Sequence, residues 1–172
     1  MALLLLSACG SSKGPEDKPK TEPTPTTAGA SPTSCTTADL RFALSAGEGT
    51  AGSAYYELEM ANVGRRPCRT GGFGGVSLVA RSGRAPIGAR AQRTQPGQAK
   101  AFLLQPGDRA HATLRETDAR NYDATECRPR RAAGLQVSPP DARQSQFVAH
   151  PATACAAPQV HLLELTPFVA GD

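Results

Sequence analysis

Apolar and polar side chains alternate one by one in many short stretches of this chain, and this period of two limits which folds it can adopt. Leu40, Phe42 and Leu44 are each separated by a single residue, and residues 56–60 repeat the pattern. Successive side chains of an extended strand point to opposite faces, so such a stretch has one face for a core and one for water. Helical periodicity is scarce by comparison. The chain is therefore expected to be all-β.

Further strand-like stretches follow, and glycine or proline bounds most of them. They lie at residues 76–79, 101–104, 110–115, 135–137, 146–148 and 160–168, with turn signals such as Gly71-Gly72, Pro96-Gly97 and Pro106-Gly107 between them. About seven to nine short strands with this punctuation predict an antiparallel, immunoglobulin-like β-sandwich. The chain has no tryptophan, which excludes the core Trp of a true immunoglobulin domain.

Residues 10–34 have a composition that cannot form a packed core. They contain five Pro, five Thr, four Ser and three Gly, and no large apolar side chain. A segment that buries so little apolar surface cannot offset the entropy of ordering, so we expect a disordered linker. The linker is a bare spacer or, as an alternative, an O-glycosylated stalk. Residues 35–172 then form one β-sandwich domain.

The four residues ahead of this linker, Leu6-Ser7-Ala8-Cys9, resemble the lipobox of bacterial lipoproteins. The resemblance implies cleavage before Cys9, a thioether-linked diacylglycerol on its thiol, further acyl chains such as palmitate, and a mature chain that begins with the lipidated Cys9 and the linker, residues 9–34. A signal peptide needs a basic start and an apolar core of roughly 7–15 residues. The chain offers only Leu3–Leu6, with no Lys or Arg before them. Residues 1–8 are therefore expected to be a truncated signal remnant, and the protein to be extracytoplasmic and anchored to the cell membrane.

Four of the five cysteines remain once Cys9 is assigned to the lipid. An even number in an exported chain indicates disulfides, and four cysteines allow three pairings. Cys35 precedes the first strand-like stretch and Cys68 follows the second, so an antiparallel hairpin would bring them to the same end. Cys127 and Cys155 each precede a strand-like stretch and are close in sequence. We therefore favour Cys35–Cys68 and Cys127–Cys155, and leave the other pairings open.

Several motifs between residues 62 and 140 carry a family resemblance. They are Asn62-Val63-Gly64, Cys68, Gly72-Phe73-Gly74-Gly75-Val76, Leu104-Gln105-Pro106-Gly107 with Ala110 and Leu114, and Pro139-Pro140. Together they resemble the signature of domain of unknown function 4232, a family of exported and lipid-anchored actinobacterial proteins, over nearly all of residues 35–168. Gly74 stands where the family usually has Pro. The resemblance implies a β-sandwich, an extracytoplasmic location and no established activity.

The charge pattern gives no clear partner. The net charge is +4, and arginine supplies most of the basic side chains. Two clusters, Arg65-Arg66-Arg69 and Arg128-Arg130-Arg131, could contact phosphates. They lack the interleaved aromatic residues and the fold motifs of nucleic-acid-binding proteins, so we expect no nucleic acid. A solvated basic face is the first interpretation, and contact with an envelope protein, a wall polymer or a lipid headgroup is the second. The oligomeric state is not predicted.

No catalytic or metal-binding motif stands out. His111, His150 and His161 show no metal-ligand spacing, and we expect His111 at a sheet edge or face and His161 facing outward. Glu57 and Glu59 share the outward face of one strand, where solvated charges are expected. Neither a nucleophile elbow nor a Cys-x-x-Cys pair is present. No catalytic residue, cofactor or metal site is therefore assigned.

The glycine-rich run from Gly71 to Gly75 lacks the Lys-Ser/Thr and the helix that a phosphate-binding loop needs. A strand-to-strand corner with glycines at positive φ explains this run better. Phe73, in its middle, is expected to point into the core, with a position at the loop tip as the alternative.

Three functions remain as hypotheses. The favoured one is a non-catalytic envelope lipoprotein whose sandwich presents loops or a sheet face to a partner. The second is an envelope hydrolase or metal-binding enzyme, which requires two histidines, or one histidine with Asp108 or Glu116, to converge within hydrogen-bond distance in one pocket. The third is a purely structural spacer domain.

Overall fold

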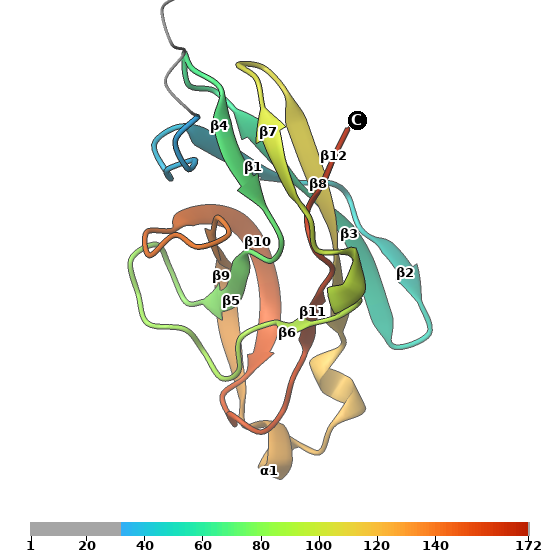
Figure 1. Cartoon of the computed structure of the whole chain (residues 1–172). Helices are drawn as coiled ribbons and strands as arrows, with labels where there is room; N and C mark the ends of the chain where they lie inside the picture. Colours follow the sequence, from blue (N-terminus) through green and yellow to red (C-terminus); the bar gives the residue numbers. More distant parts are fainter. Residues whose placement is uncertain (1–31, 172) are drawn as a thin grey trace, which may run out of the picture. The chain divides into compact units, whose positions relative to one another are not determined.

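The computed structural model describes residues 32–171, and within them strands make up nearly all regular structure (Figure 1). The strands are β1 (Leu40–Leu44), β2 (Glu48–Thr50), β3 (Ser53–Asn62), β4 (Cys68–Gly71), β5 (Gly75–Val79), β6 (Gln92–Arg93), β7 (Ala101–Leu104), β8 (Arg109–Thr117), β9 (Pro129–Ser138), β10 (Gln146–Cys155), β11 (Leu163–Leu165) and β12 (Val169–Ala170). The helical pieces are the four-residue α1 (Ala124–Cys127) and two 3₁₀ turns, η1 (Pro96–Gln98) and η2 (Ala119–Asn121). The all-β prediction is confirmed. The signal-like stretch, Cys9 and nearly all of the predicted linker lie outside the described residues.

Three sheets form the sandwich. The largest has the order β1-β3-β8-β11-β6, with β2 paired to β3 and β12 paired to β8. A three-stranded sheet, β10-β9-β5, and a two-stranded sheet, β4-β7, complete the set. In Figure 1 the sheet β10-β9-β5 lies beside the large sheet, with β4 and β7 above it. One side of the described domain is thus a single sheet, and the other is divided into two.

The period-two alternation in the sequence sets which face of each strand enters the core. In β3, Leu58 and Met60 are fully buried, whereas Glu57 is exposed. Their partners on β8 are Ala112 and Ala110, which are buried as well. Apolar residues of β5, β9, β11 and the C-terminal segment join the same core cluster. Burial of this apolar surface is the main force holding the sheets together.

Two features of the C-terminal region differ from the sequence-based expectation. Residues 160–168 were expected to form one strand, but only Leu163–Leu165 do so. Leu162 and Leu163 are both buried, which strict alternation does not permit, so the chain bends before β11. In addition, β11 pairs with β6 in parallel, whereas all other strand pairs within the named sheets are antiparallel.

Two disulfides join Cys35 to Cys68 and Cys127 to Cys155, which is the pairing that the sequence favours. The first ties the segment before β1 to the start of β4. The second joins the end of α1 to the end of β10. Cys155 therefore ends a strand and does not precede one as expected. Because β9 and β10 form an antiparallel hairpin, the segment before β9 and the end of β10 meet.

The glycine-rich run forms the predicted corner between β4 and β5. Gly71 and Gly72 have φ values of +133° and +86°, and a Cβ on Gly71 would lie 2.2 Å from the carbonyl oxygen of Lys100. The favoured prediction for Phe73, a position in the core, was wrong. Its ring is half-buried and lies 5.4 Å from the guanidinium carbon of Arg93, because the corner turns the ring toward this exposed cation rather than into the core.

Candidate functional site

The core-facing row of β8 ends in a charged residue. Ala110, Ala112 and Leu114 are fully or almost fully buried, and Glu116, two residues further on, continues their face of the strand. Its register partner on β3 is Ala54. The Glu116 carboxylate thus lies on the inner face of the large sheet, at the margin of the apolar core. Its side chain is only 11% exposed.

His150 meets this carboxylate from the opposite side of the sandwich. It lies in β10, within the register irregularity between Ala149 and Ala152, where a bulge can aim a side chain differently from a regular strand. The distance from its Nε2 to Oε2 of Glu116 is 2.6 Å, and its side chain is 12% exposed. One hydrogen-bonded pair therefore joins the large sheet to the three-stranded sheet. It is an ion pair when the imidazole is protonated.

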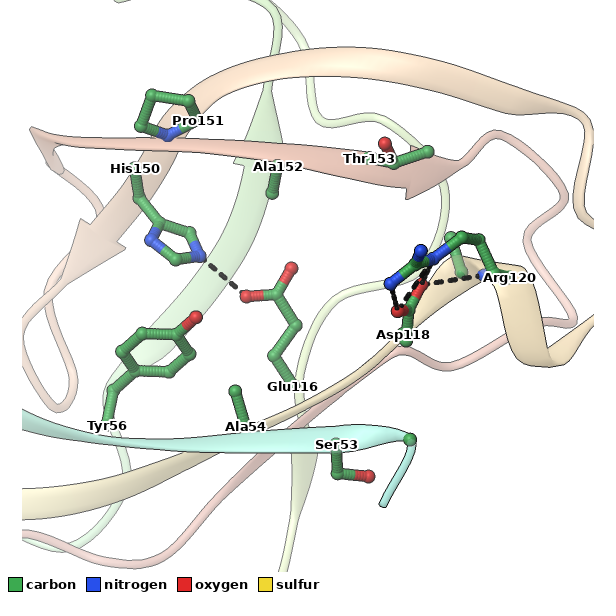
Figure 2. A pocket seen from close by; sticks show the side chains of 12 residues that line it. Ser53, Ala54, Tyr56, Glu116, Asp118, Arg120, His150, Pro151, Ala152 and Thr153 are labelled. Carbon is green, nitrogen blue, oxygen red and sulfur yellow. Dashed lines mark hydrogen bonds and ion pairs between the residues drawn. The ribbon is translucent and has the colours of Figure 1, made fainter. Parts of the chain in front are cut away.

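Tyr56 completes this cluster from β3. Its ring packs edge-on against the His150 imidazole, with the ring centroids 4.8 Å apart and the planes at 80°. Figure 2 shows the three side chains converging from three strands. Burial, and secondly the negative charge of Glu116, raises the pKa of the Tyr56 hydroxyl. The phenol therefore stays protonated at neutral pH and can donate a hydrogen bond.

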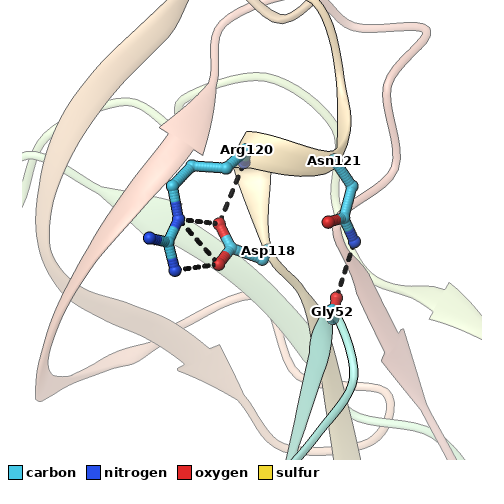
Figure 3. A network of polar contacts seen from close by, with 4 residues as sticks. All are labelled: Gly52, Asp118, Arg120 and Asn121. Atoms are coloured by element: carbon cyan, nitrogen blue, oxygen red, sulfur yellow. Dashed lines mark hydrogen bonds and ion pairs between the residues drawn. The ribbon is translucent and has the colours of Figure 1, made fainter.

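The turn η2 follows β8 directly and lies beside the cluster of Glu116, His150 and Tyr56. Asp118 caps η2, since its carboxylate accepts a hydrogen bond of 2.9 Å from the Arg120 N–H. The same carboxylate accepts bonds from Nε and Nη2 of Arg120. Hydrogen bonds from the guanidinium, and then from the backbone, lower the pKa of the Asp118 carboxyl. Asn121 donates to the carbonyl oxygen of Gly52 at 2.7 Å, which fixes η2 to the β2–β3 turn (Figure 3).

These elements enclose an open pocket of about 640 Å³ between β3, β8, η2 and β10. Its lining combines two carboxylates, an imidazole, a phenol and the guanidinium of Arg120 with small apolar surfaces such as Ala54 and Ala152. Such a hollow offers donors and acceptors of both charges to a polar ligand.

The pocket also provides part of an acid–base arrangement. A hydrolytic triad has a nucleophile, an imidazole base and a carboxylate that orients the imidazole. Glu116 and His150 could fill the second and third roles. Among the described residues, the only side-chain hydrogen bond of His150 is the one to Glu116, so no hydroxyl or thiol is hydrogen-bonded to the imidazole. The enzyme hypothesis requires a histidine and Glu116 to converge in one pocket, and His150 and Glu116 do so. Within the described residues, no nucleophile is positioned beside them.

The other histidines and the paired glutamates lie elsewhere. His111 is on the face of β8, with Nδ1 3.1 Å from the carbonyl oxygen of Gly171. His161 is exposed beside the buried Val160, as predicted. Glu57 is exposed, and Glu59 pairs with Arg109 at 2.6 Å. Within residues 32–171, no group of three or more His, Cys, Asp or Glu is arranged to hold a metal ion.

The two arginine clusters named from the sequence are exposed and do not enter this pocket. Arg65 and Arg66 border a separate shallow depression with Asp39. Arg128 lies in the left-handed region, with φ of +50°, where it ends α1.

Sequence reasoning did not single out Tyr56, Asp118 or Arg120 as site residues, and it named His150 and Glu116 only as one of the combinations that an enzyme would require. One signal was available, since Glu116 falls on the buried face of its strand by simple alternation with Leu114. The partner of that carboxylate was not available from the sequence, because it depends on which strands of the two sheets face each other.

The fold is an all-β sandwich with two disulfide bonds. Disulfides of this kind indicate an oxidising, extracytoplasmic environment. Among residues 32–171, no helix is long and apolar enough to cross a membrane. The chain belongs to the family described as Domain of unknown function (DUF4232), whose model matches residues 35–169. No curated protein and no solved structure matches the chain.

Proposed function

We propose that this protein is a non-catalytic lipoprotein of the cell envelope, anchored through a lipid on Cys9, and that its sandwich domain binds a polar partner in the pocket at Glu116 and His150. The membrane is its first partner, through the lipid. The second is an envelope protein or wall polymer whose exposed polar groups enter the pocket. No cofactor, metal or nucleic acid is part of the proposal.

The observation that carries the binding proposal is a polar cluster at positions where the strand pattern calls for apolar residues. Glu116 continues a row of buried apolar residues, and His150 lies two residues after the buried Val148. Placing a charge at the margin of a core costs desolvation energy that an apolar residue would not incur. Departures from the folding pattern of this kind concentrate at functional sites.

The chemistry of the lining favours a ligand with both donors and acceptors over a simple anion or cation. Glu116 offers an oxygen that can accept a further hydrogen bond, and Tyr56 offers a hydroxyl. Asp118 and Arg120 neutralise each other, because the guanidinium forms an ion pair with the carboxylate. A peptide segment or a glycan with hydroxyl and amide groups fits this mixture.

Site-specific photo-crosslinking in intact cells tests the binding proposal. A photoreactive residue at Thr153, an exposed residue of the pocket wall, is expected to form one discrete adduct. The adduct should diminish when Glu116→Gln is added. Val63 is 53% exposed and follows the end of β3 opposite to Ala54, so the same probe there is the control. Equal adducts at both positions, or none at Thr153, would contradict pocket binding and favour the spacer hypothesis.

The lipid proposal needs its own test, since Cys9 lies outside the described residues. Intact-mass analysis of protein from the membrane fraction is expected to give a mature chain that begins at Cys9 and carries a diacylglycerol with one or more further acyl chains. Two or more chains give stable anchoring, whereas one binds reversibly. Recovery of a soluble chain with an unmodified Cys9 thiol would overturn it.

The enzyme hypothesis is the second candidate, because the 2.6 Å pair of His150 and Glu116 meets its requirement. It predicts turnover of ester, amide or glycoside substrates that His150→Gln abolishes, with the thermal unfolding midpoint checked in parallel. Binding without turnover supports the first proposal. Turnover that requires His150 would replace it.

A further inference from the structure

The outer face of the three-stranded sheet carries polar side chains beneath a loop. On β5 and β9, Val76 pairs with Val137 and Leu78 with Leu135, and these four residues face the core. The intervening pair, Ser77 and Gln136, therefore projects from the opposite face. Ser77 is nonetheless only 5% exposed. A neighbouring segment therefore shields Ser77, whereas Gln136 beside it is half-buried.

That covering segment is the connection of residues 80–91 between β5 and β6. It runs along the free edge of β5, where the N–H of Ile87 donates to the carbonyl oxygen of Leu78 at 2.8 Å and the N–H of Ala91 donates to that of Val76 at 2.9 Å. These bonds fix the loop like an irregular extra strand. The connection is thereby held in place beside the polar floor.

Three arginines surround a hollow of about 560 Å³ above this floor. Arg84 and Arg90 come from the covering loop, and Arg143 comes from the connection between β9 and β10. We call this hollow, with Ser77, Gln136 and Ser138 as its floor and Arg84, Arg90 and Arg143 as its rim, the arginine groove. Among residues 32–171, no aspartate or glutamate lines it. It is separate from the Glu116–His150 pocket, whose lining shares no residue with it.

The rim arginines differ from those paired elsewhere in the domain. Arg109, Arg115 and Arg120 each contact a carboxylate. Within residues 32–171, no ion pair involves the side chain of Arg84, Arg90 or Arg143. Three exposed guanidinium groups around one hollow repel one another unless an anion lies between them. Guanidinium forks match the oxygens of phosphate in two-point hydrogen bonds.

The floor adds a second recognition element. The amide of Gln136 donates from Nε2 to the hydroxyl of Ser145 at 2.6 Å, which fixes the amide and leaves its oxygen as an acceptor. The hydroxyls of Ser77 and Ser138 can donate or accept. These groups suit the hydroxyls of a polyol, and the hollow is larger than one phosphate group requires. The arginine rim therefore suits a phosphate group, and the floor suits the hydroxyls of a polyol attached to it.

We infer that the arginine groove binds the phosphate ester of a polyol, with the phosphate held by the rim arginines and the polyol hydroxyls held by the floor. A soluble glycerol phosphate and the glycerol phosphate headgroup of a lipid share this chemistry. The inference does not depend on the role proposed for the Glu116–His150 pocket.

Calorimetric titration of the full chain carrying Cys9→Ser, with sn-glycerol 3-phosphate as the probe, tests this inference. Saturable binding is expected, with glycerol alone giving no heat and inorganic phosphate binding more weakly. The variant R84Q/R90Q/R143Q should weaken binding by roughly tenfold or more, since each guanidinium contributes charge-assisted hydrogen bonds. The matched control, R41Q/R130Q/R131Q, removes the same charge from exposed arginines outside the groove and should leave binding unchanged.

Two further measurements make the outcome decisive. Chemical-shift changes on titration should centre on the backbone amides of Ser77 and Gln136 in the chain with an intact groove, which requires no groove variant to fold. Vesicles containing phosphatidylglycerol distinguish the lipid source, because co-sedimentation that depends on the rim arginines assigns the headgroup and its absence assigns the soluble ester. No saturable binding, equal loss in both triple variants, or shift changes centred elsewhere would overturn the inference.

Discussion

Asn62 shows how one side chain can hold two sheets in register. It is the last residue of β3 and only 1% exposed. Its Nδ2 donates to the carbonyl oxygens of Leu104 and Arg66, each at 3.0 Å, and its Oδ1 accepts from the N–H of Gly64 at 2.9 Å. Because Leu104 belongs to β7, these bonds join the large sheet to the two-stranded sheet. The Asn62-Val63-Gly64 motif thus has a structural explanation.

Replacement of Asn62 should destabilise the domain strongly. Asn62→Ala removes three hydrogen bonds and leaves the buried carbonyl of Leu104 without this donor, so we expect a loss of about 2–3 kcal/mol in the free energy of unfolding. Urea unfolding followed by circular dichroism measures it. Asn121→Ala is the matched control, since that exposed amide makes one bond to Gly52 and should cost about 0.5–1 kcal/mol. Similar losses for both variants would contradict the assigned role.

Asp39 should give the domain an acid-sensitive contribution to stability. Hydrogen bonds from the hydroxyl and then from the N–H of Thr36 lower the pKa of this carboxyl below its unfolded value. A lowered folded-state pKa contributes stability that is present above the unfolded pKa and lost as the pH falls through the folded pKa. Asp39→Asn should therefore cost about 0.5–1 kcal/mol at neutral pH and progressively less at acid pH.

Unfolding free energies at neutral and at strongly acid pH test this dependence on Asp39. Asp123→Asn removes the same charge from a side chain that makes no capping hydrogen bond, and it serves as the control. A cost of Asp39→Asn that stays constant, or that grows as the pH falls, would show that the Thr36 bonds do not favour the ionised carboxyl.

At the scale of elements, the contact between β8 and β10 includes one largely buried polar pair, Glu116 and His150. Removing one partner leaves the other desolvated, so Glu116→Gln and His150→Gln should each cost about 2–3 kcal/mol. The double variant should cost less than their sum, with a coupling energy of about 1–3 kcal/mol. Chemical denaturation of the two single variants and the double variant closes the cycle.

A more exposed ion pair on β8 serves as the control for the effect of burial on the coupling energy. Arg115 and Glu164 join β8 to β11 at 2.9 Å, with both side chains 34% exposed. Exposed pairs couple weakly, at about 0–1 kcal/mol. If the two cycles give the same coupling energy, the inter-sheet pair has no special role in joining the sandwich.

The elements also show how far sequence reasoning reaches. Period-two alternation locates β1 and most of β3 and β8, because one face of each of these strands is buried. It misses the two-residue strands β6 and β12, which have too few side chains to form a pattern. Glu116 could be placed on the inner face from Leu114. Its contact with His150 requires the pairing of strands distant in sequence and the irregularity in β10, neither of which local pattern encodes.

At the scale of the whole molecule, each disulfide fixes one part of the sandwich. Cys35–Cys68 ties β1 to the two-stranded sheet, and Cys127–Cys155 closes the β9–β10 hairpin at the end near α1. The bridged residues are 33 and 28 positions apart. Loops of such similar length should lose similar entropy in the unfolded chain, which corresponds to about 3–4 kcal/mol for each bridge.

The two bridges should therefore contribute nearly equally and additively. Cys35→Ala with Cys68→Ala, and Cys127→Ala with Cys155→Ala, are each expected to lower the free energy of unfolding by about 2–5 kcal/mol. A domain of this size has a total stability of about 5–15 kcal/mol, so removing both bridges should leave a large unfolded fraction at physiological temperature. Urea unfolding of the two paired variants, and of the unaltered chain with and without reductant, provides the measurements. Unchanged unfolding in reductant would show that the apolar core alone holds the sheets together, and the domain would then have no structural need for an oxidising environment.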